Sequence, residues 1–275
     1  MKHSISITII LVALFLVSHV IGLLVIKHYL PESSELPLGI QKPQLESNTS
    51  FIPIFIMIIV ATIIALFLMK FEAMRLWKFW FLISVFVTLV VSFSSFLNSI
   101  IAIIAAVIFA IWKTFKPNIY IHNFTELFIY GGLAAIFVPV LSPISIIILL
   151  VLISIYDMIA VWKTKHMVSM AKFQTKSKMF VGLLVPYKKT KENKKIKSEK
   201  VSEAILGGGD IAFPLMLSGV VLKTFGFIPA LIISLSASLG LILLLILAKK
   251  GKFYPAMPFI SAACFIGYFI VFLSF

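Results

Sequence analysis

The sequence predicts an all-α polytopic membrane protein with nine transmembrane helices. Of its 275 residues, 61% are hydrophobic and only 12% are charged, whereas soluble domains are about half apolar and about a quarter charged. The mean hydropathy is +1.13, and long apolar runs alternate with short polar breaks. A soluble all-α protein with a very large core does not fit this pattern.

The apolar runs divide into nine expected spans, at residues 5–26, 51–69, 76–93, 97–112, 124–140, 143–162, 204–223, 227–248 and 256–274. Two runs are too long for one helix, and each contains a break. Polar residues 92–99 divide the run 79–112, and the prolines of 138–143 divide the run 124–162. The N-terminal run resembles a signal peptide, but it is longer than usual and no cleavage site follows. We therefore interpret it as a retained first span.

Basic residues lie mainly on one side of the predicted membrane. Counted from the N-terminus, the odd-numbered polar segments hold 21 of the 24 Lys and Arg residues, 12 of them between residues 163 and 200. The asymmetry remains without that loop. The positive-inside rule then places the N-terminus in the cytoplasm and the C-terminus outside the cell membrane. The net charge of +14 therefore reflects topology and contact with anionic lipid headgroups, not nucleic-acid binding.

The sequence divides into three regions. Residues 1–162 form an N-terminal six-span region, residues 163–203 a basic cytoplasmic loop, and residues 204–275 a C-terminal three-span region. The loop contains one apolar piece, KMFVGLLVPYKK, at residues 178–189. We expect this piece to rest on the lipid headgroups, and the alternative is a short interfacial helix beside a functional site.

Two aspartates lie inside predicted spans. Asp157 is about five residues before the end of the sixth span, and Asp210 is about six residues into the seventh. Both would lie ~8–10 Å from the same membrane face, and because the two helices are consecutive and antiparallel, their carboxyl groups can meet. An Asp at a helix centre costs ~2.5–3.5 kcal/mol on insertion scales, which favours a functional role. Glu126, near the cytoplasmic end of the fifth span, is expected at headgroup level.

Two carboxyl groups so close cannot both be ionised, so they hold one proton between them. An aspartic protease uses this arrangement to activate water and to protonate the peptide carbonyl. Depth alone leaves open a structural or ion-conducting pair. We expect no metal and no cofactor, because the sequence shows no HExxH motif, no cluster with metal-ligand spacing and no Ser–His pair.

Three short motifs accompany these aspartates. In chain order they are Tyr156-Asp157, Gly207-Gly208-Gly209-Asp210 and Pro255-Ala256-Met257. They resemble the YD, GxGD and PAL signatures of the presenilin and signal peptide peptidase family of intramembrane aspartyl proteases. The resemblance covers essentially the whole chain, and the compact chain looks like the archaeal members of the family.

The resemblance implies a presenilin-like fold and an endopeptidase that cleaves within transmembrane segments of other membrane proteins. It implies that Asp157 and Asp210 are catalytic. Tyr156 and the three glycines would support the active site. The substrate-binding residues that it implies are Ala204, Ile205, Leu206, Pro255, Ala256 and Met257. The first three of these would pair with the substrate as a strand. Membrane lipid is an expected partner, and a homo-oligomer is left open.

The glycines also have a physical explanation. Without side chains, Gly207 and Gly209 allow another backbone to approach Asp210. Pro214 cannot donate a hydrogen bond to the carbonyl of Asp210, which loosens the helix there. Close packing of helices in lipid is the alternative reason for the glycines.

A literal Pro229-Ala230-Leu231 opens the eighth span. It lies on the membrane side opposite the aspartates, so we assign the PAL role to Pro255–Met257. Met257 then replaces Leu, a close apolar substitute in volume.

Two other classes compete with the protease. A proton-coupled transporter or a cation-leak channel could use the same aspartates, although no inverted repeat is visible. A prepilin-peptidase-like enzyme also carries GxGD, but nine spans and the third motif argue against it. His19 is expected to make an interhelical hydrogen bond. Tyr156 points ~100° away from Asp157 on a helix, so packing against a neighbouring helix is its alternative role.

Overall fold

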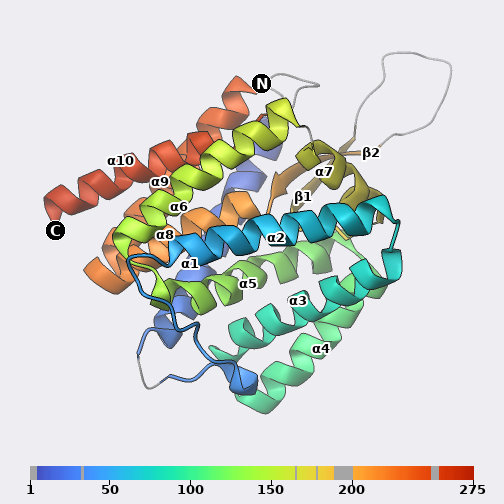
Figure 1. The fold of residues 1–275 in the computed structure, drawn as a ribbon, viewed down its shortest axis with the longest axis horizontal. Helices are drawn as coiled ribbons and strands as arrows, with labels where there is room; N and C mark the ends of the chain where they lie inside the picture. The colour runs from blue at the N-terminus through green and yellow to red at the C-terminus, as the bar shows by residue number, and fades with distance from the viewer. Residues whose placement is uncertain (1–4, 32–33, 165, 178, 189–200, 249–253) are drawn as a thin grey trace.

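The computed structural model describes residues 5–31, 34–164, 166–177, 179–188, 201–248 and 254–275. The α-helices within these residues are α1 (Ile5–Tyr29), α2 (Phe51–Lys70), α3 (Met74–Ser94), α4 (Ser99–Phe115), α5 (Ile119–Phe137), α6 (Pro143–Met158), α7 (His166–Ser177), α8 (Gly209–Phe225), α9 (Phe227–Leu247) and α10 (Met257–Ser274) (Figure 1). The strands are β1 (Gly182–Lys188) and β2 (Val201–Gly207). Short 3₁₀ turns occupy Pro37–Gly39 and Val138–Val140, and α6 continues as a π-helical turn, Ile159–Lys163.

Every predicted span coincides with one helix. Seven helices in the described part of the chain are long and apolar enough to cross a membrane. The other two predicted spans correspond to α4 and α8, which have 17 residues each and are therefore ~26 Å long. The predicted polytopic helical fold is thus confirmed. The seventh span differs in kind from its prediction, since its helix begins at Gly209 and not at residue 204, because the residues up to Gly207 form β2.

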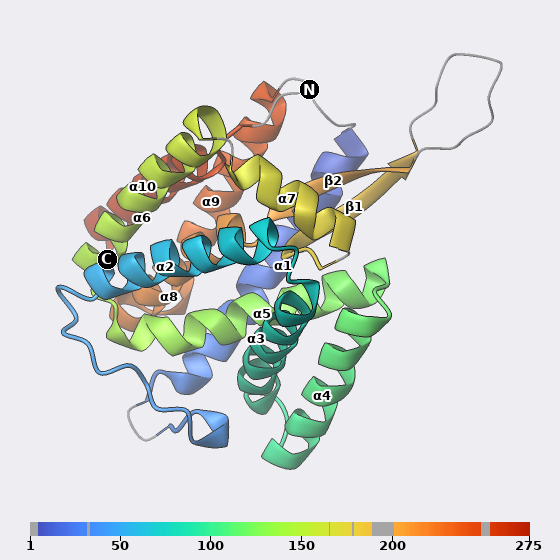
Figure 2. The ribbon, with the colours of Figure 1, turned by 45° about the vertical axis from the view of Figure 1, so that its right-hand side comes forward.

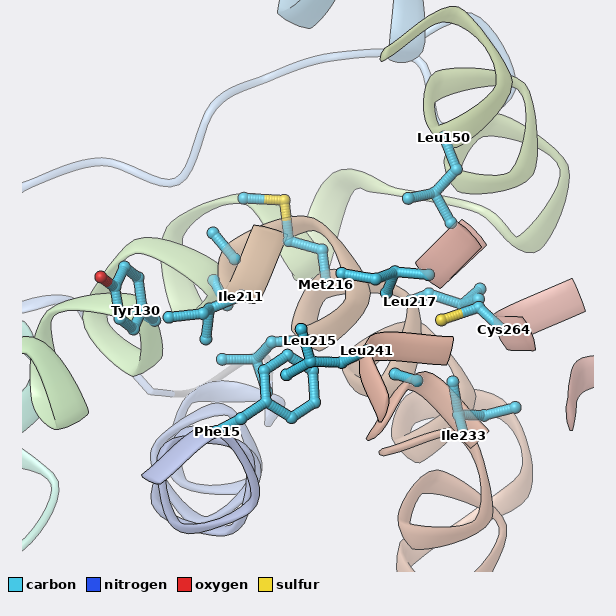
Figure 3. Close-up of a cluster of buried hydrophobic side chains, with 14 of the residues drawn as sticks. Phe15, Tyr130, Leu150, Ile211, Leu215, Met216, Leu217, Ile233, Leu241 and Cys264 are labelled. Carbon is cyan, nitrogen blue, oxygen red and sulfur yellow. The ribbon is translucent and has the colours of Figure 1, made fainter. Parts of the chain in front are cut away.

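The helix α8 lies at the centre of the bundle. It packs against α1, α5, α6 and α9, and nearly all of its residues between Asp210 and Leu222 are buried. Figure 3 shows Ile211, Leu215, Met216 and Leu217 of α8 surrounded by side chains of α1, α6, α9 and α10. Dense packing of this kind fixes the position of α8 and therefore of the residues at its N-terminus.

A second core lies between α3, α4 and α5. Small side chains on α4, at Ala102, Ala106 and Ala110, are buried there against large residues of α3, including Phe81 and Leu89. Helix α2 is more peripheral and packs against α3, α6 and α7. Figure 2 shows α3 and α4 diverging from the α6, α9 and α10 group, with α1 and α5 between them.

The loop between α6 and α8 contains the elements that the sequence did not predict. The short interfacial helix considered for residues 178–189 is wrong, because Gly182–Lys188 forms a strand. That this piece rests on the headgroups stays a prediction, and residues 178 and 189 lie outside the described residues. The strand β1 pairs with β2 in antiparallel fashion, with Gly182 opposite Gly207 and Leu184 opposite Ile205. The resulting hairpin contacts α1 and α5 (Figure 2).

Candidate active site

The two aspartates come from neighbouring helices. Asp157 lies near the end of α6 and Asp210 at the beginning of α8, and these helices pack against each other. Both side chains are buried, with 2% of Asp157 and 8% of Asp210 exposed. They are close enough for the charge of Asp157 to act on Asp210. The structure therefore brings the two predicted catalytic residues together.

The carboxylate of Asp157 is held by the N-terminus of α10. Its Oδ2 accepts a hydrogen bond from the backbone N–H of Met257 at 3.1 Å, and the amide of Ala256 also contributes. Unpaired N–H groups at the start of a helix favour an anion in this position. The other oxygen, Oδ1, is buried and has no hydrogen-bond partner among the described residues. One oxygen is thus fixed, and the second is left for another ligand or reactant.

Asp210 lies in the first turn of α8, closer to the helix end than the sequence suggested. The chain arrives as β2 and becomes helical only at Gly209. A carboxylate at this position faces the positive end of the helix dipole, and the backbone of Gly207 contributes a further hydrogen bond. The predicted cost of a charge inside a span is therefore reduced by the irregular backbone that precedes it.

The glycines before Asp210 do not have equal roles. A Cβ atom on Gly208 would lie 2.8 Å from Cγ1 of Val181 and 3.1 Å from Cε1 of Tyr130, so a side chain there requires a rearrangement. A Cβ atom on Gly207 would lie 3.1 Å from Oδ2 of Asp210, where it would crowd the carboxylate. At Gly209 the nearest atom would be at an ordinary distance, 3.5 Å.

The outer edge of β1 is covered by side chains of α5. The amide group of Asn123 donates to the carbonyl of Leu184 at 2.7 Å and accepts from its N–H at 3.0 Å. In the same way, Glu126 Oε2 accepts from the N–H of Gly182 at 3.1 Å, and His122 Nε2 donates to its carbonyl at 2.7 Å. Four side-chain hydrogen bonds therefore take the place of a third strand on this side.

This arrangement determines which backbone groups of β2 face away from the hairpin. Because Gly182 and Leu184 direct their polar groups to α5, the residues opposite them, Gly207 and Ile205, direct theirs to the outer edge of β2. The Ile205 side chain is 42% exposed. The outer edge of β2 is therefore open at Ile205 and ends beside Asp210.

Glu126 is the centre of a buried network that the sequence did not reveal. Its expected position at headgroup level stays a prediction, but its side chain is buried within the protein and forms an ion pair with Lys113 of α4 at 2.7 Å. Glu126 also accepts a hydrogen bond from the hydroxyl of Tyr130, whose ring lies against Gly208. Lys113 donates in addition to Thr125 at 3.0 Å. The network thus joins α4 and α5 to the hairpin and to the residues before Asp210.

Tyr156 is not brought to the aspartate pair. Its hydroxyl lies 3.2 Å from Oγ1 of Thr62 in α2 and 3.0 Å from Nε2 of His166 in α7. The single hydroxyl proton of Tyr156 is donated to Thr62, so Nε2–H of the His166 imidazole donates to the Tyr156 oxygen. Tyr156 therefore connects α6 to α2 and α7, which agrees with the packing role considered for it. The hydrogen bond expected for His19 is also present, at 3.0 Å from Ser234 of α9.

The two PAL-like segments lie in different surroundings. Pro255–Met257 precedes α10 and contacts Asp157 through its backbone, whereas Pro229 and Ala230 lie in the first turn of α9. Helix α9 follows the far end of α8, ~24 Å along the helix axis from Asp210. Within the described residues, no group of three or more His, Cys, Asp or Glu side chains is placed to hold a metal ion.

Comparison with known proteins gives a consistent result. The family model described as signal-peptide peptidase, presenilin aspartyl protease matches residues 12–275. No curated protein matches the chain. Two solved structures of a presenilin family intramembrane aspartate protease are similar to it. One, in space group C222, has 19% identity and a TM-score of 0.68 and covers 97% of this chain and 98% of its own. The other, in space group P2, has 20% identity, a TM-score of 0.66 and 96% coverage of both chains.

The hairpin anchor can be tested by replacing its buried charges. Glu126→Leu should lower the free energy of unfolding by ~3–5 kcal/mol, because the charge of Lys113 is then buried without a partner. Adding Lys113→Met should restore most of the stability, since an apolar pair of similar volume is tolerated. The amide of Gly182 should nevertheless exchange faster in both variants, because its acceptor is absent.

The measurements are thermal unfolding in detergent and hydrogen exchange of the hairpin. Asn123→Ala serves as a control that removes the bonds to Leu184 without disturbing a charge. Unchanged exchange at Gly182 in the double variant would contradict the anchoring role of Glu126.

Proposed function

Because the chain belongs to the signal-peptide peptidase and presenilin aspartyl protease family, we propose that Asp157 and Asp210 are the catalytic pair with which it cleaves peptide bonds inside the membrane. The protein is an intramembrane aspartic endopeptidase by its family. The observation that supports these two residues is their convergence, since they are buried carboxyl groups from different helices and interact electrostatically. The alternative of a transporter or channel finds no support in the family or in the similar structures.

The proposed chemistry needs only water and one shared proton. The ionised carboxylate takes a proton from a water molecule, whose oxygen attacks the peptide carbonyl carbon. The protonated carboxyl group gives its proton to the carbonyl oxygen, and the tetrahedral intermediate then breaks at the C–N bond as the amine leaves with a proton. The hydrogen bond from Met257 to Oδ2 of Asp157 supports this scheme, because it orients that carboxyl group and leaves Oδ1 free for the reaction.

The substrate is proposed to bind as a strand along β2. A peptide bond in a helix is hydrogen-bonded within the helix, so the substrate must unwind before it is cut. The outer edge of β2 offers the polar groups of Ile205 to an extended backbone, which is the geometry of β-augmentation. Ala204 and Leu206 pair with β1 and hold this edge in place, and Gly207 brings the strand to Asp210 without a side chain between them.

The support roles follow the same geometry. Pro255, Ala256 and Met257 are assigned to substrate binding and to orientation of Asp157. The absence of a side chain at Gly207 keeps space beside Asp210, and at Gly208 it allows Val181 and Tyr130 to pack closely. Tyr156 supports the site indirectly by fixing α6. Gly209 is kept as a support residue because it begins α8 directly before Asp210.

The proposal includes the orientation of the chain in the membrane and the partners of the protein. The asymmetry of the Lys and Arg residues supports a cytoplasmic N-terminus and an extracellular C-terminus, in an integral multi-pass protein of the cell membrane. The family implies transmembrane protein substrates. Membrane lipid and a second copy of the chain are the further partners considered.

The catalytic assignment predicts that each aspartate is indispensable. Asp157→Asn and Asp210→Asn, and the corresponding alanine variants, should reduce cleavage by at least ~10²–10⁴-fold. The free energy of unfolding should change by no more than ~1–2 kcal/mol, because no buried charge loses a partner. The measurement is cleavage of a single-span substrate by purified protein in detergent, with and without a transition-state-mimicking aspartyl protease inhibitor.

The exposed acid Glu35 provides the control, since Glu35→Ala should cleave normally. Proteolysis close to the wild-type rate in either aspartate variant would show that the pair is assigned wrongly.

The substrate-strand assignment predicts a difference between neighbouring residues of β2. Ile205→Pro removes an outward-facing N–H and no bond to β1, so cleavage should fall ~10-fold or more while the melting temperature is kept. Leu206→Pro removes a bond to Leu183 of β1 and should lower the melting temperature as well. Both variants are measured for kcat/KM and for thermal unfolding. Wild-type cleavage by Ile205→Pro would rule out substrate pairing at this edge.

The two PAL-like segments predict a second contrast. Ala256→Trp and Met257→Asp should abolish cleavage or shift its position, because they disturb the turn that binds Asp157. Ala230→Trp and Leu231→Asp should act only through folding, since Ala230 is fully buried but distant from the aspartates. Activity is scored per folded molecule. Equal loss of this specific activity in both sets would remove the reason for preferring Pro255–Met257.

A further inference from the structure

A polar pocket lies at the ends of α3 and α4, away from the aspartates. It has a volume of about 510 Å³ and lies at the turn from α4 to α5. In Figure 2 this turn is at the end of α5 that lies near the hairpin. The polar residues that line the pocket are Lys78 from α3, Thr114 from the end of α4, and Lys116 and Asn118 from the α4–α5 connection.

The charge of this pocket is positive and unbalanced. Lys78 of α3 and Lys116 of the α4–α5 connection line it, and no acidic residue lines it. Within the described residues, neither lysine forms an ion pair, since Glu126 is occupied by Lys113. Two ammonium groups facing one space favour an anionic ligand.

An exposed amide group adds a hydrogen-bond donor to the pocket. Asn118 lines it, and because its Oδ1 accepts from the N–H of Tyr120 at 2.9 Å, its Nδ2 is available. Thr114 also lines the pocket, but its Oγ1 is enclosed by the protein and does not face the open space. The N-terminus of α5 begins at the same turn and also favours negative charge.

The surroundings of the pocket match the membrane interface. Trp112 lines it and is 45% exposed, and Phe115 beside it is 59% exposed. Aromatic residues of this kind gather at the headgroup level of bilayers. Below them, α4 presents exposed Ile104, Ile108 and Ile111, a surface on which acyl chains can lie.

We propose that this pocket binds the phosphate group of an anionic phospholipid whose acyl chains lie along the exposed face of α4. The ligand chemistry is a phosphate anion that accepts a hydrogen bond from Asn118 and is neutralised by Lys78 and Lys116. The bound lipid connects the beginning of α3 to the α4–α5 turn, on which the Lys113–Glu126 pair depends. This site is independent of the proposed catalytic pair.

The test uses purified full-length protein and native mass spectrometry. The probes are phosphatidylglycerol and phosphatidylcholine with identical chains, and inorganic phosphate as competitor. The pocket variant is the double variant Lys78→Gln with Lys116→Gln. The control double variant, Lys70→Gln with Arg75→Gln, removes the same charge from exposed positions outside the pocket.

The double pocket variant should weaken phosphatidylglycerol binding by ~10–30-fold, and the control by no more than ~3-fold. Equal weakening of phosphatidylglycerol binding in the control variant would show that general surface charge, and not the pocket, attracts the lipid. This result would overturn the proposal. Equal binding of phosphatidylcholine would also overturn it, and so would complete displacement by inorganic phosphate at the concentration of the lipid, which would indicate a free-anion site.

Discussion

The structure depends on one constraint, which is that a β-hairpin placed among membrane helices must satisfy the polar groups on both of its edges. Where water is excluded, each unpaired N–H or C=O group is costly. The edge of β1 is satisfied by side chains of α5, through Asn123, His122 and Glu126. The edge of β2 is not covered in the same way at Ile205. The proposed binding of an extended substrate backbone at this edge would satisfy it, and this is the physical reason for the proposal.

The same constraint explains why charged residues are buried in the neighbourhood of the hairpin. Glu126 accepts three hydrogen bonds, from Lys113, Tyr130 and Gly182, so its charge is compensated from α4, from α5 itself and from the hairpin. Removing any one of these donors leaves the others in place but disturbs the position of β1. Because the Tyr130 ring also lies against Gly208, the hydrogen-bond network of Glu126 contacts the residues directly before α8. Asp157 is held separately, by the start of α10.

The spans and the aspartate pair could be predicted because they depend on local patterns. Long apolar runs, the asymmetry of basic residues and two acids at matching depth are all visible along the chain. The hairpin could not be predicted, because residues 204–208 are as apolar as the helix that follows and their partner strand lies in a loop read as basic and solvated. The burial of Glu126 was missed for a similar reason, since its partner Lys113 was counted as a topology signal. A signal was nevertheless present, because His122, Asn123 and Glu126 place three polar side chains close together in an otherwise apolar helix.

The most direct measurement is a structure of the Asp210→Asn variant bound to a single-span substrate in lipid nanodiscs. The Asn side chain keeps the shape of the site while preventing hydrolysis, so the substrate should remain intact. The account predicts an extended substrate segment hydrogen-bonded to the N–H and carbonyl groups of Ile205, with a peptide bond placed between residues 157 and 210. A substrate that remains helical, or that pairs with β1 after displacing Asn123 and Glu126, would contradict it.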